Sequence, residues 1–300
     1  MNLTNKFNLP DIYCEAVQIF ESDYDRGDSD FTASQLPRPA YLDSLLREHW
    51  DTLTEDVSDR IWALSGQVGH LIFERVAKKY PERYIAEQRW FTNLKGHRIS
   101  GRGDCLDLST GVLWDWKRTS VWKFILGDLE EWTAQANVNA YCARMNGHTI
   151  KALKNLVELK DHKVRLARIT RREDYPPSPV HVCPLELWSI GQAQDYILLR
   201  ATAHESKSPP LCTKKERWQR DAEYAVMKKG RASAIRKYSS HDQAWAVLQE
   251  CEKKAKPWEK GKYFLEERQS EPVRCLDFCP VKAVCQFGQE AKKKWKDKQE

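Results

Sequence analysis

Hydrophobic and polar positions alternate with two different periods along the chain, and together they predict an α/β core. Between residues 61 and 80, apolar side chains recur at helical spacing, at Ile61, Leu64, Val68, Ile72 and Val76. Two β-like runs follow, at about 97–106 and 112–118, and the turn residues between them predict a hairpin. A helix is then expected over about 129–145.

The remaining pattern extends this core and divides the chain. A third β-like run is expected over 163–169 and a helix over 187–204. Beyond Pro209-Pro210 the sequence predicts polar helices and a lysine-rich, disordered end. We therefore expect an N-terminal helical and acidic segment packing on the core, the core itself, a C-terminal helical region with metal-binding cysteines, and a basic tail. Their boundaries are 1–60, 61–205, 206–290 and 291–300.

Charge is distributed unevenly along the 300 residues, whose formal net charge is +6. Residues 1–60 carry 5 Lys and Arg against 13 Asp and Glu, whereas residues 201–300 carry 23 against 15. A basic body favours a polyanionic partner such as DNA, although a solvated lysine-rich surface would give the same balance. Because the acidic part cannot face the same phosphate backbone, we expect residues 21–31 to lie outside the DNA path, or to cover it when it is empty.

Two further features of the sequence indicate the cellular compartment of the protein. No apolar run approaches the roughly 20 residues that span a bilayer, and the first ten residues lack the basic-then-apolar plan of a secretory signal. We therefore expect a cytoplasmic protein with no membrane partner. In a reducing compartment, nine cysteines favour metal binding or buried thiols over disulfides.

Acidic and basic side chains converge in the predicted hairpin. Asp115 and Lys117 are two residues apart on one strand, so they share a face. The hairpin brings Asp104, near the end of the first β-like run, beside Asp115. Two carboxylates and an ammonium can hold a hard divalent cation and orient a water. A salt-bridged surface hairpin would contain the same residues, and Asp107 competes with Asp104 for the first position.

The segments around the hairpin decide between these interpretations, because in their order they resemble the PD-(D/E)XK nuclease superfamily. The similarity is to its RecB-like branch, which includes phage-encoded and CRISPR-associated cysteine-cluster exonucleases, and it covers about residues 30–290. The matching motifs are Gly66-x3-His70-x3-Glu74, the glycine-rich run Ser100-Gly-Arg-Gly-Asp104, Asp115-x-Lys117, a helix around Gln135, and Cys275-x3-Cys279-x5-Cys285.

The resemblance implies a restriction-endonuclease-like core, in which helices flank a central mixed β-sheet, and it assigns roles to individual residues. His70, Asp104, Asp115 and the carbonyl of Trp116 would bind one or two Mg²⁺ or Mn²⁺ ions. Lys117 would orient the attacking water. The glycine-rich run before Asp104 makes it the first carboxylate of the family pattern.

Two helical residues complete the expected catalytic site. Gln135 lies on an apolar helical face and would help to position the DNA strand, the alternative being a satisfied core amide. Glu74 would ligate the metal, or only orient His70 or the backbone. The family usually has a tyrosine within a turn of the glutamine, and here Asn139 occupies that place, so the role of that tyrosine is not transferred.

The cysteine group implies a second metal centre. Cys275, Cys279 and Cys285 supply three thiolates, and the resemblance to phage members makes Cys212 the fourth. A structural [4Fe–4S] cluster is expected on them, with zinc as the alternative. The CRISPR-associated members place their first cysteine before the core, where this chain has Leu36-Pro37-Arg38.

The expected function is therefore a divalent-metal-dependent DNA exonuclease that hydrolyses phosphodiester bonds from single-stranded or duplex DNA ends. The resemblance further implies a role in phage or bacterial recombination or repair, with a recombination protein as a possible partner. Two alternatives remain open: a nuclease of a CRISPR adaptation complex, and a non-catalytic DNA-binding or partner-recruiting module with the same fold.

Overall fold

The structure is a computed structural model, and it describes residues 1–22, 27–127, 129–169, 175–219 and 221–296. The chain divides into two compact units, Met1–Pro210 and Leu211–Glu300. Four residues of the acidic segment 21–31, and the last four residues of the predicted basic tail, lie outside the described part. No described helix is both long and apolar enough to cross a membrane.

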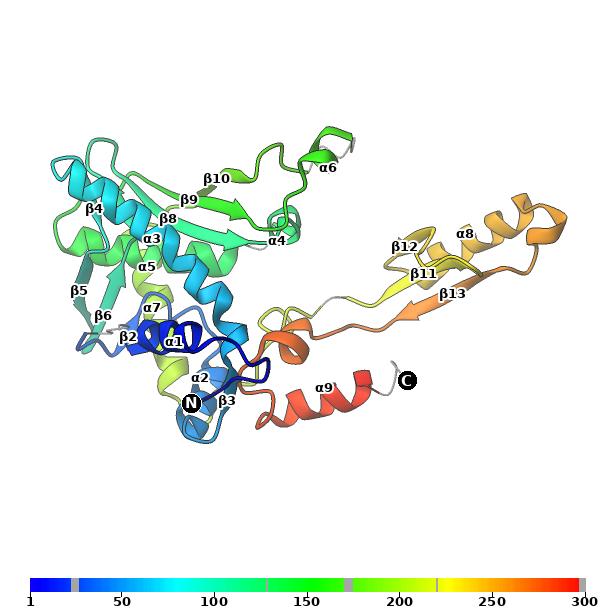
Figure 1. The fold of residues 1–300 in the computed structure, drawn as a ribbon, viewed down its shortest axis with the longest axis horizontal. Helices are drawn as coiled ribbons and strands as arrows, with labels where there is room; N and C mark the ends of the chain where they lie inside the picture. Colours follow the sequence, from blue (N-terminus) through cyan, green and yellow to red (C-terminus); the bar gives the residue numbers. More distant parts are fainter. Residues whose placement is uncertain (23–26, 128, 170–174, 220, 297–300) are drawn as a thin grey trace. The chain divides into compact units, whose positions relative to one another are not determined.

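The first unit is α/β, with mixed sheets flanked by helices (Figure 1). Its main sheet has the order β10-β9-β8-β7-β4, in which β8 and β9 are parallel and the other neighbours are antiparallel. The strands are β4 (Tyr84–Ala86), β7 (Cys105–Asp107), β8 (Val112–Thr119), β9 (Ala152–Leu159) and β10 (Val180–Leu185). Two smaller sheets, β2-β6-β5 and β1-β3, consist of β1 (Asn2–Thr4), β2 (Phe31–Thr32), β3 (Thr54–Asp56), β5 (Arg89–Leu94) and β6 (His97–Arg102).

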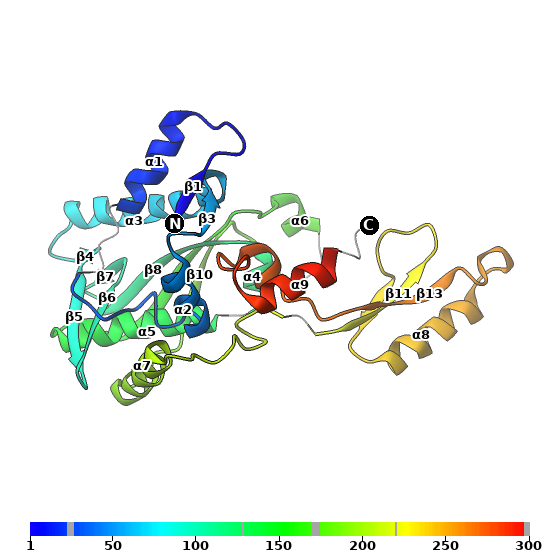
Figure 2. The ribbon, with the colours of Figure 1, turned by 90° about the horizontal axis from the view of Figure 1, so that it is seen from below.

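Helices cover both faces of the main sheet: α3 lies on one side and α5 on the other (Figures 1 and 2). The helices of this unit are α1 (Asp11–Ser22), α2 (Ala40–His49), α3 (Ile61–Lys79), α4 (Val121–Leu126), α5 (Glu130–Met145), α6 (Val164–Ile169) and α7 (Ile190–Glu205), with a short 3-10 helix η1 (Val57–Arg60). Apolar side chains of the strands, such as Leu106, Leu113 and Leu153, pack with Val138 and Ala140 of α5 in the largest core cluster. Burial of this apolar surface stabilises the unit.

The predicted β-like run 97–106 is two strands rather than one. β6 pairs with β5, and β7 pairs with β8, so the chain crosses from one sheet to the other at Gly103-Asp104. The crossing brings the backbone close to its neighbours: a Cβ on Gly103 would lie 2.7 Å from Cδ1 of Leu113, and a Cβ on Gly101 would lie 2.9 Å from Cα of Asn139. The glycine-rich run therefore fits the close packing immediately before Asp104.

Helix α3 is present as predicted, but its apolar stripe does not face the core. An apolar stripe at helical spacing ordinarily packs inward, whereas here Val68 is 54% exposed and Ile72 is 44% exposed. The side of α3 that packs against β8 carries Gly69 instead, and a Cβ there would lie 2.2 Å from Cγ of Trp116. The indole of Trp116 fills the space that a side chain on α3 would otherwise occupy.

The third predicted strand is wrong, because residues 164–169 form helix α6. The strand that follows α5 is β9, in which buried and half-buried positions alternate along its whole length. Asn155 and Lys154 interrupt its apolar pattern, which explains why hydrophobicity alone did not reveal it. β9 pairs in parallel with β8 and so extends the sheet beyond the hairpin.

The second unit contains a sheet that the sequence pattern did not predict. Strands β11 (Glu223–Lys228), β12 (Arg236–Tyr238) and β13 (Tyr263–Arg268) pair in the order β12-β11-β13, and helix α8 (His241–Lys254) packs on them through Ala244 and Leu248. A short 3-10 helix η2 (Pro257–Glu259), a π-helical turn η3 (Arg274–Phe278) and helix α9 (Gln286–Lys296) complete the unit. The predicted disordered tail is helical as far as Lys296.

Candidate active site

Asp104 lies opposite Asp115, where β7 and β8 begin to pair. Cys105 pairs with Trp114, so the residues one step outward in this antiparallel register are Asp104 and Asp115. Both aspartates are buried, with 4% and 5% of their surface exposed. The backbone N–H of Trp116 donates a hydrogen bond to Oδ2 of Asp104 over 2.6 Å. The predicted convergence of the two carboxylates is therefore present in the structure.

Lys117 points to the same place from β8. Its Nζ lies 2.8 Å from Oδ2 of Asp115 and donates to Oε1 of Gln135 over 2.9 Å. Gln135 comes from α5, on the face of the sheet opposite α3 (Figure 2). The glutamine accepts a hydrogen bond from the ammonium and the aspartate forms an ion pair with it, so the two side chains together fix its position. Gln135 is thus a partnered amide, and its partner is the predicted catalytic lysine.

A third group of side chains lies around Oδ1 of Asp104, the oxygen that does not accept the hydrogen bond from Trp116. Nδ1 of His70 lies 3.4 Å from Oδ1 of Asp104 and 2.7 Å from Oε1 of Glu87. One ligand atom from each of these three residues lies within 4.8 Å of the other two. An imidazole and two carboxylates at this separation could hold one divalent cation.

Glu87 is a site residue that sequence reasoning missed, and its carboxylate occupies the place predicted for Glu74. Glu74 instead pairs with Lys78 on the outer part of α3, at 2.7 Å. Glu87 follows β4 in the left-handed backbone region, with φ of 55°, and also lies 3.4 Å from Nε of Arg102. A single carboxylate in an irregular turn belongs to no periodic pattern, so spacing does not reveal it. The positive φ itself is visible only in the structure.

Asn155 is a second site residue without a sequence signal. It is in register with Asp115 across the parallel β8–β9 pair and is 1% exposed. In the part of the chain that the structure describes, neither its amide nitrogen nor its amide oxygen has a hydrogen-bond partner. Because a buried unpaired amide costs free energy, this position fits a water or ligand held beside Asp115.

Asp107, the rival for the first carboxylate, has a structural role. Its side chain lies 3.1 Å from Nη2 of Arg83 and accepts hydrogen bonds from the backbone and hydroxyl of Ser109. These contacts lower the pKa of Asp107 against the opposing effect of burial. The carboxylate stabilises the β7–β8 turn and lies away from the group around Asp104.

Burial and charge change the proton affinity of the site. Burial, together with the negative charge of Asp115, raises the pKa of Asp104 to about 7, although His70 and Lys117 act in the opposite direction. Burial lowers the pKa of His70, but the hydrogen bond to Glu87 and the charges of the carboxylates outweigh it and raise this pKa. Crowded carboxylates with a raised pKa are typical of sites that receive a cation.

The carboxylate group opens into a pocket of about 180 Å³. His70, Asp104 and Gln135 line it together with two arginines, Arg89 and Arg102. Cationic side chains beside a cation-binding carboxylate group suit a substrate that carries its own negative charge, such as a phosphodiester.

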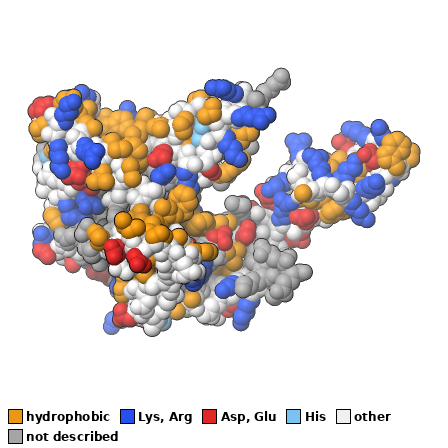
Figure 3. All heavy atoms as spheres, in the orientation of Figure 1, with side chains coloured by type: hydrophobic (Ala, Val, Ile, Leu, Met, Phe, Trp, Pro, Cys, Tyr) orange, Lys and Arg blue, Asp and Glu red, His pale blue; other side chains and the backbone are white. Residues whose placement is uncertain are grey.

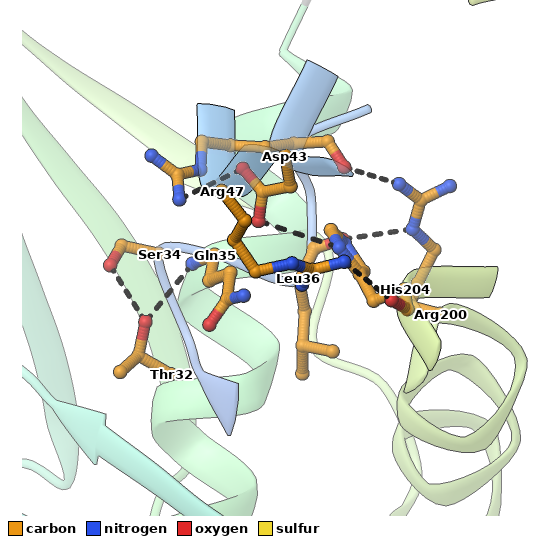
Figure 4. Close-up of polar contacts among 9 residues, drawn as sticks. Thr32, Ser34, Gln35, Leu36, Asp43, Arg47, Arg200 and His204 are labelled. Atoms are coloured by element: carbon orange, nitrogen blue, oxygen red, sulfur yellow. Dashed lines mark hydrogen bonds and ion pairs between the residues drawn. The ribbon is translucent and has the colours of Figure 1, made fainter. Parts of the chain in front are cut away.

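A larger pocket of about 990 Å³ lies behind one wall of this pocket. Thr32 and Ser34 line the small pocket, whereas Phe31 and Gln35 line the large one, so the segment 31–35 separates the two. Figure 4 shows how the wall is anchored. Arg200 donates to the carbonyls of Leu36 and Arg38, at 2.8 and 2.5 Å.

The buried carboxylate of Asp43 and its neighbours support the same wall from behind. Nδ1 of His204 on α7 lies 3.4 Å from Oδ2 of Asp43 on α2, and Nη2 of Arg38 lies 3.0 Å from the other carboxylate oxygen (Figure 4). Arg47 donates to the carbonyl of His204 over 3.2 Å. Because the contacts of His204 with Asp43 and Arg47 join residues more than 150 positions apart, they fix α2 against α7.

The four predicted cysteine ligands all lie in the second unit. Burial raises the pKa of Cys212 to about 12, and the charges of Glu216, Cys279 and Cys275 add to the effect. Burial raises the pKa of Cys275 to about 11, followed by the charges of Cys279 and Cys285. The thiols therefore lie near enough to affect one another. Among the described residues, however, no three cysteine sulfurs all lie within 4.8 Å of one another, so they do not form a compact cluster.

Comparison with known proteins gives distant similarity in fold only. No protein-family model matches the chain, and no curated protein matches it. The solved structure of SSO0001 is similar with a TM-score of 0.45 and 13% sequence identity, over 66% of this chain and 86% of that chain. Similarity at this level is a distant relationship in fold and assigns no activity to this chain.

Proposed function

We propose that this protein is a divalent-metal-dependent DNA nuclease with a PD-(D/E)XK core. The observation that carries the proposal is the meeting of Asp104, Asp115 and Lys117, from two paired strands, with His70 of the helix on one face of the sheet. The mixed sheet between α3 and α5 supports the proposal as an α/β scaffold for these residues. Buried carboxylates beside a cationic pocket favour hydrolysis of a phosphodiester over a structural salt bridge.

The donor set fits Mg²⁺ or Mn²⁺. His70, Glu87, Asp104 and Asp115 would hold the ion, and the carbonyl of Trp116 stays a predicted further ligand. The carboxylates supply the oxygen ligands that hard cations prefer, and the unpaired amide of Asn155 leaves a buried polar partner for a water. When bound, the ion would neutralise charge on the scissile phosphate and acidify a water.

The remaining chemistry belongs to the protein's own residues. Lys117 donates hydrogen bonds and would hold the attacking water or hydroxide in line with the phosphorus atom. Gln135 and Asp115 fix the direction of its ammonium. Arg89 and Arg102 would bind the non-bridging oxygens of the phosphate, because both line the pocket that contains Asp104.

The substrate proposed is DNA, cut from its ends as an exonuclease in phage or bacterial recombination or repair, with a recombination protein as possible partner. This part rests on the sequence resemblance and on the excess of Lys and Arg in residues 61–300. The test is digestion of 5′- and 3′-labelled single-stranded and duplex DNA by anaerobically purified protein. We expect cleavage with Mg²⁺ or Mn²⁺ and none with EDTA; no cleavage of any of these DNAs under any metal condition would contradict the proposal.

For the cysteines we propose a structural [4Fe–4S] cluster on Cys212, Cys275, Cys279 and Cys285. A zinc ion bound tetrahedrally at about 2.3 Å would need sulfurs about 3.8 Å apart, which is closer than any three of these described thiols lie. The choice of an iron–sulfur cluster rests on the sequence resemblance of the cysteine group, Cys275-x3-Cys279-x5-Cys285 with Cys212. The cluster would fix the loop that carries Cys212 against η3.

The cluster has a direct spectroscopic test. Anaerobic protein should absorb broadly near about 400 nm, and Cys279→Ser and Cys212→Ser should each remove this absorption. Cys14→Ser is the matched control, because Cys14 lies in the other unit and should leave the spectrum unchanged. Colourless protein with one zinc per chain would replace the iron assignment.

A further inference from the structure

The second unit contains a small module with a cationic end. Two loops form this end, residues 228–231 and 253–262, which we call the basic tip. They adjoin one another: the N–H of Lys229 donates to the carbonyl of Lys262 over 2.8 Å, and Nζ of Lys228 lies 2.5 Å from Oε1 of Glu259. The sheet β12-β11-β13 and helix α8 support both loops through the core around Val226.

Glu259, the acidic residue of the basic tip, and Glu252, which directly precedes its second loop, both form contacts within the module. Glu252 accepts hydrogen bonds from the backbone N–H of Gly261, at 3.0 Å, and of Tyr263, at 3.2 Å. Glu259 pairs with Lys228. These contacts hold the loop 257–263 in place, and the charge of Glu259 is divided between Lys228 and Lys256.

Six cations of the basic tip form no ion pair within the described residues, and of these only Lys256 has its charge beside a carboxylate, that of Glu259. No ion pair joins any of them to an acidic side chain within the described residues, and all six are exposed. They are Lys229, Arg231, Lys253, Lys256, Lys260 and Lys262. Figure 3 shows Lys and Arg side chains gathered over the module that contains β11, α8 and β13. Unpaired cations held close together repel one another, so a negatively charged partner would stabilise the tip.

An aromatic ring stands among these cations. Trp258 is 67% exposed, and Nζ of Lys256 lies 5.3 Å from the centre of its ring. It is the one large apolar side chain in the sequence of the two loops. An exposed indole next to a set of lysines offers a flat surface for stacking and charges for phosphate.

We propose that the basic tip binds a strand of nucleic acid, with phosphates on its lysines and a base stacked on Trp258. A strand carries both features at regular spacing, so it uses the cations and the ring together. An anionic membrane would also attract lysines, but insertion calls for a continuous apolar face, and the loops offer one isolated indole. The tip would be a second binding site for the DNA substrate, in addition to the catalytic carboxylates. Its role in binding substrate rests on the proposed nuclease function, whereas the binding of nucleic acid itself does not.

The test measures binding of the full-length protein to a fluorescent 20-nucleotide single strand in EDTA, by anisotropy. We expect Trp258→Ala to weaken binding about fivefold or more. Trp245→Ala is the matched control, because Trp245 is 49% exposed on α8 outside the two loops, and it should leave the affinity unchanged. Lys260→Glu with Lys262→Glu should weaken binding and flatten its salt dependence. Arg236→Glu with Lys237→Glu makes the same change of charge on β12, and it should weaken binding less than the Lys260 and Lys262 pair does.

The outcomes separate this proposal from the proposed function. If the protein cleaves no DNA, but Trp258→Ala lowers affinity and Trp245→Ala does not, the tip binds nucleic acid and the nuclease proposal fails. If cleavage occurs and Trp258→Ala and the double Lys variant bind like the parent protein, the tip proposal fails. Loss of sedimentation with phosphatidylserine vesicles in the Trp258→Ala variant, with unchanged DNA affinity, would assign the tip to a membrane and overturn it.

Discussion

At the scale of single residues, Asp104 is where stability and chemistry oppose each other. Its carboxylate is buried beside Asp115, and this raises its pKa to about 7. When an acid has a higher pKa in the folded than in the unfolded state, the protein becomes less stable as the pH rises from about 4 to 7. Above pH 7 the charged carboxylate therefore destabilises the protein unless a cation is bound.

Asp104→Asn should consequently stabilise the metal-free protein at pH 8, on the order of 2 kcal/mol. The amide oxygen can still accept the hydrogen bond from Trp116. In differential scanning fluorimetry, Mn²⁺ should raise the Tm of the parent protein and should not raise that of the variant. An equal rise in both would show that Asp104 does not hold the ion.

His204, which supports the segment behind the active site, should make the stability of the protein depend on pH. Burial lowers its pKa, although Asp43 and the carbonyl of Leu36 oppose this, and Arg200 and Arg38 add to it. The folded state then binds fewer protons than the unfolded state below about pH 6.5. Denaturant unfolding should show that the parent protein loses more stability between pH 7.5 and 5.5 than His204→Gln does. Equal losses would mean that His204 does not titrate on unfolding in this range.

At the scale of elements, the packing of α3 on β8 sets the position of His70. Gly69 and Gly66 lie on the same helix, but a Cβ at Gly69 would lie 2.2 Å from the indole of Trp116, whereas a Cβ at Gly66 would meet no atom within 4 Å. The two glycines therefore form a matched pair for testing this contact.

Gly69→Ala should displace α3 from the sheet and cost about 1–3 kcal/mol of stability. Gly66→Ala should instead stabilise the helix by up to about 1 kcal/mol. Because His70 follows Gly69 directly, only the first variant should also weaken binding of Mn²⁺, measured by calorimetry. If both variants were stabilised and bound Mn²⁺ like the parent, the close approach of α3 and β8 would be wrong.

Elements differ in how far the sequence could predict them. Asp115 and Lys117 could be placed on one face because strand alternation is strict, and the turn brought Asp104 opposite. The packed face of α3 could not be predicted, since it is defined by the absence of a side chain at Gly69 and by the indole it meets. Glu87 and Asn155 could not be predicted either, because their importance comes from the contacts and register of distant segments.

At the scale of the whole molecule, charge should govern how DNA is held. Residues 1–60 have 8 more acidic than basic residues, the difference between 13 and 5, whereas the remainder is basic. Binding should weaken steeply with salt, with log K falling by roughly 0.7 per neutralised phosphate for a single strand, for each tenfold rise in salt. Anisotropy titrations at salt concentrations from about 50 to about 300 mM, which lie on both sides of physiological ionic strength, would give this slope of log K against log salt concentration.

Neutralising the acidic segment tests the direction of the effect. Asp23→Asn with Asp25→Asn removes two negative charges and should leave DNA affinity unchanged or raise it, because repulsion of phosphate decreases. Circular dichroism would verify that the variant is folded. A folded variant that no longer binds DNA at any salt concentration would contradict this charge distribution.

The central claim is that Lys117 acts on the attacking water in a metal-dependent hydrolysis, and one measurement tests it most directly. Single-turnover cleavage of end-labelled DNA with Mn²⁺ would be compared for the parent protein and Lys117→Ala, with DNA affinity measured in parallel. We predict a loss of cleavage of at least about 100-fold, with affinity retained because many other cations bind phosphate. A Lys117→Ala protein that cleaves at the parent rate would contradict the account.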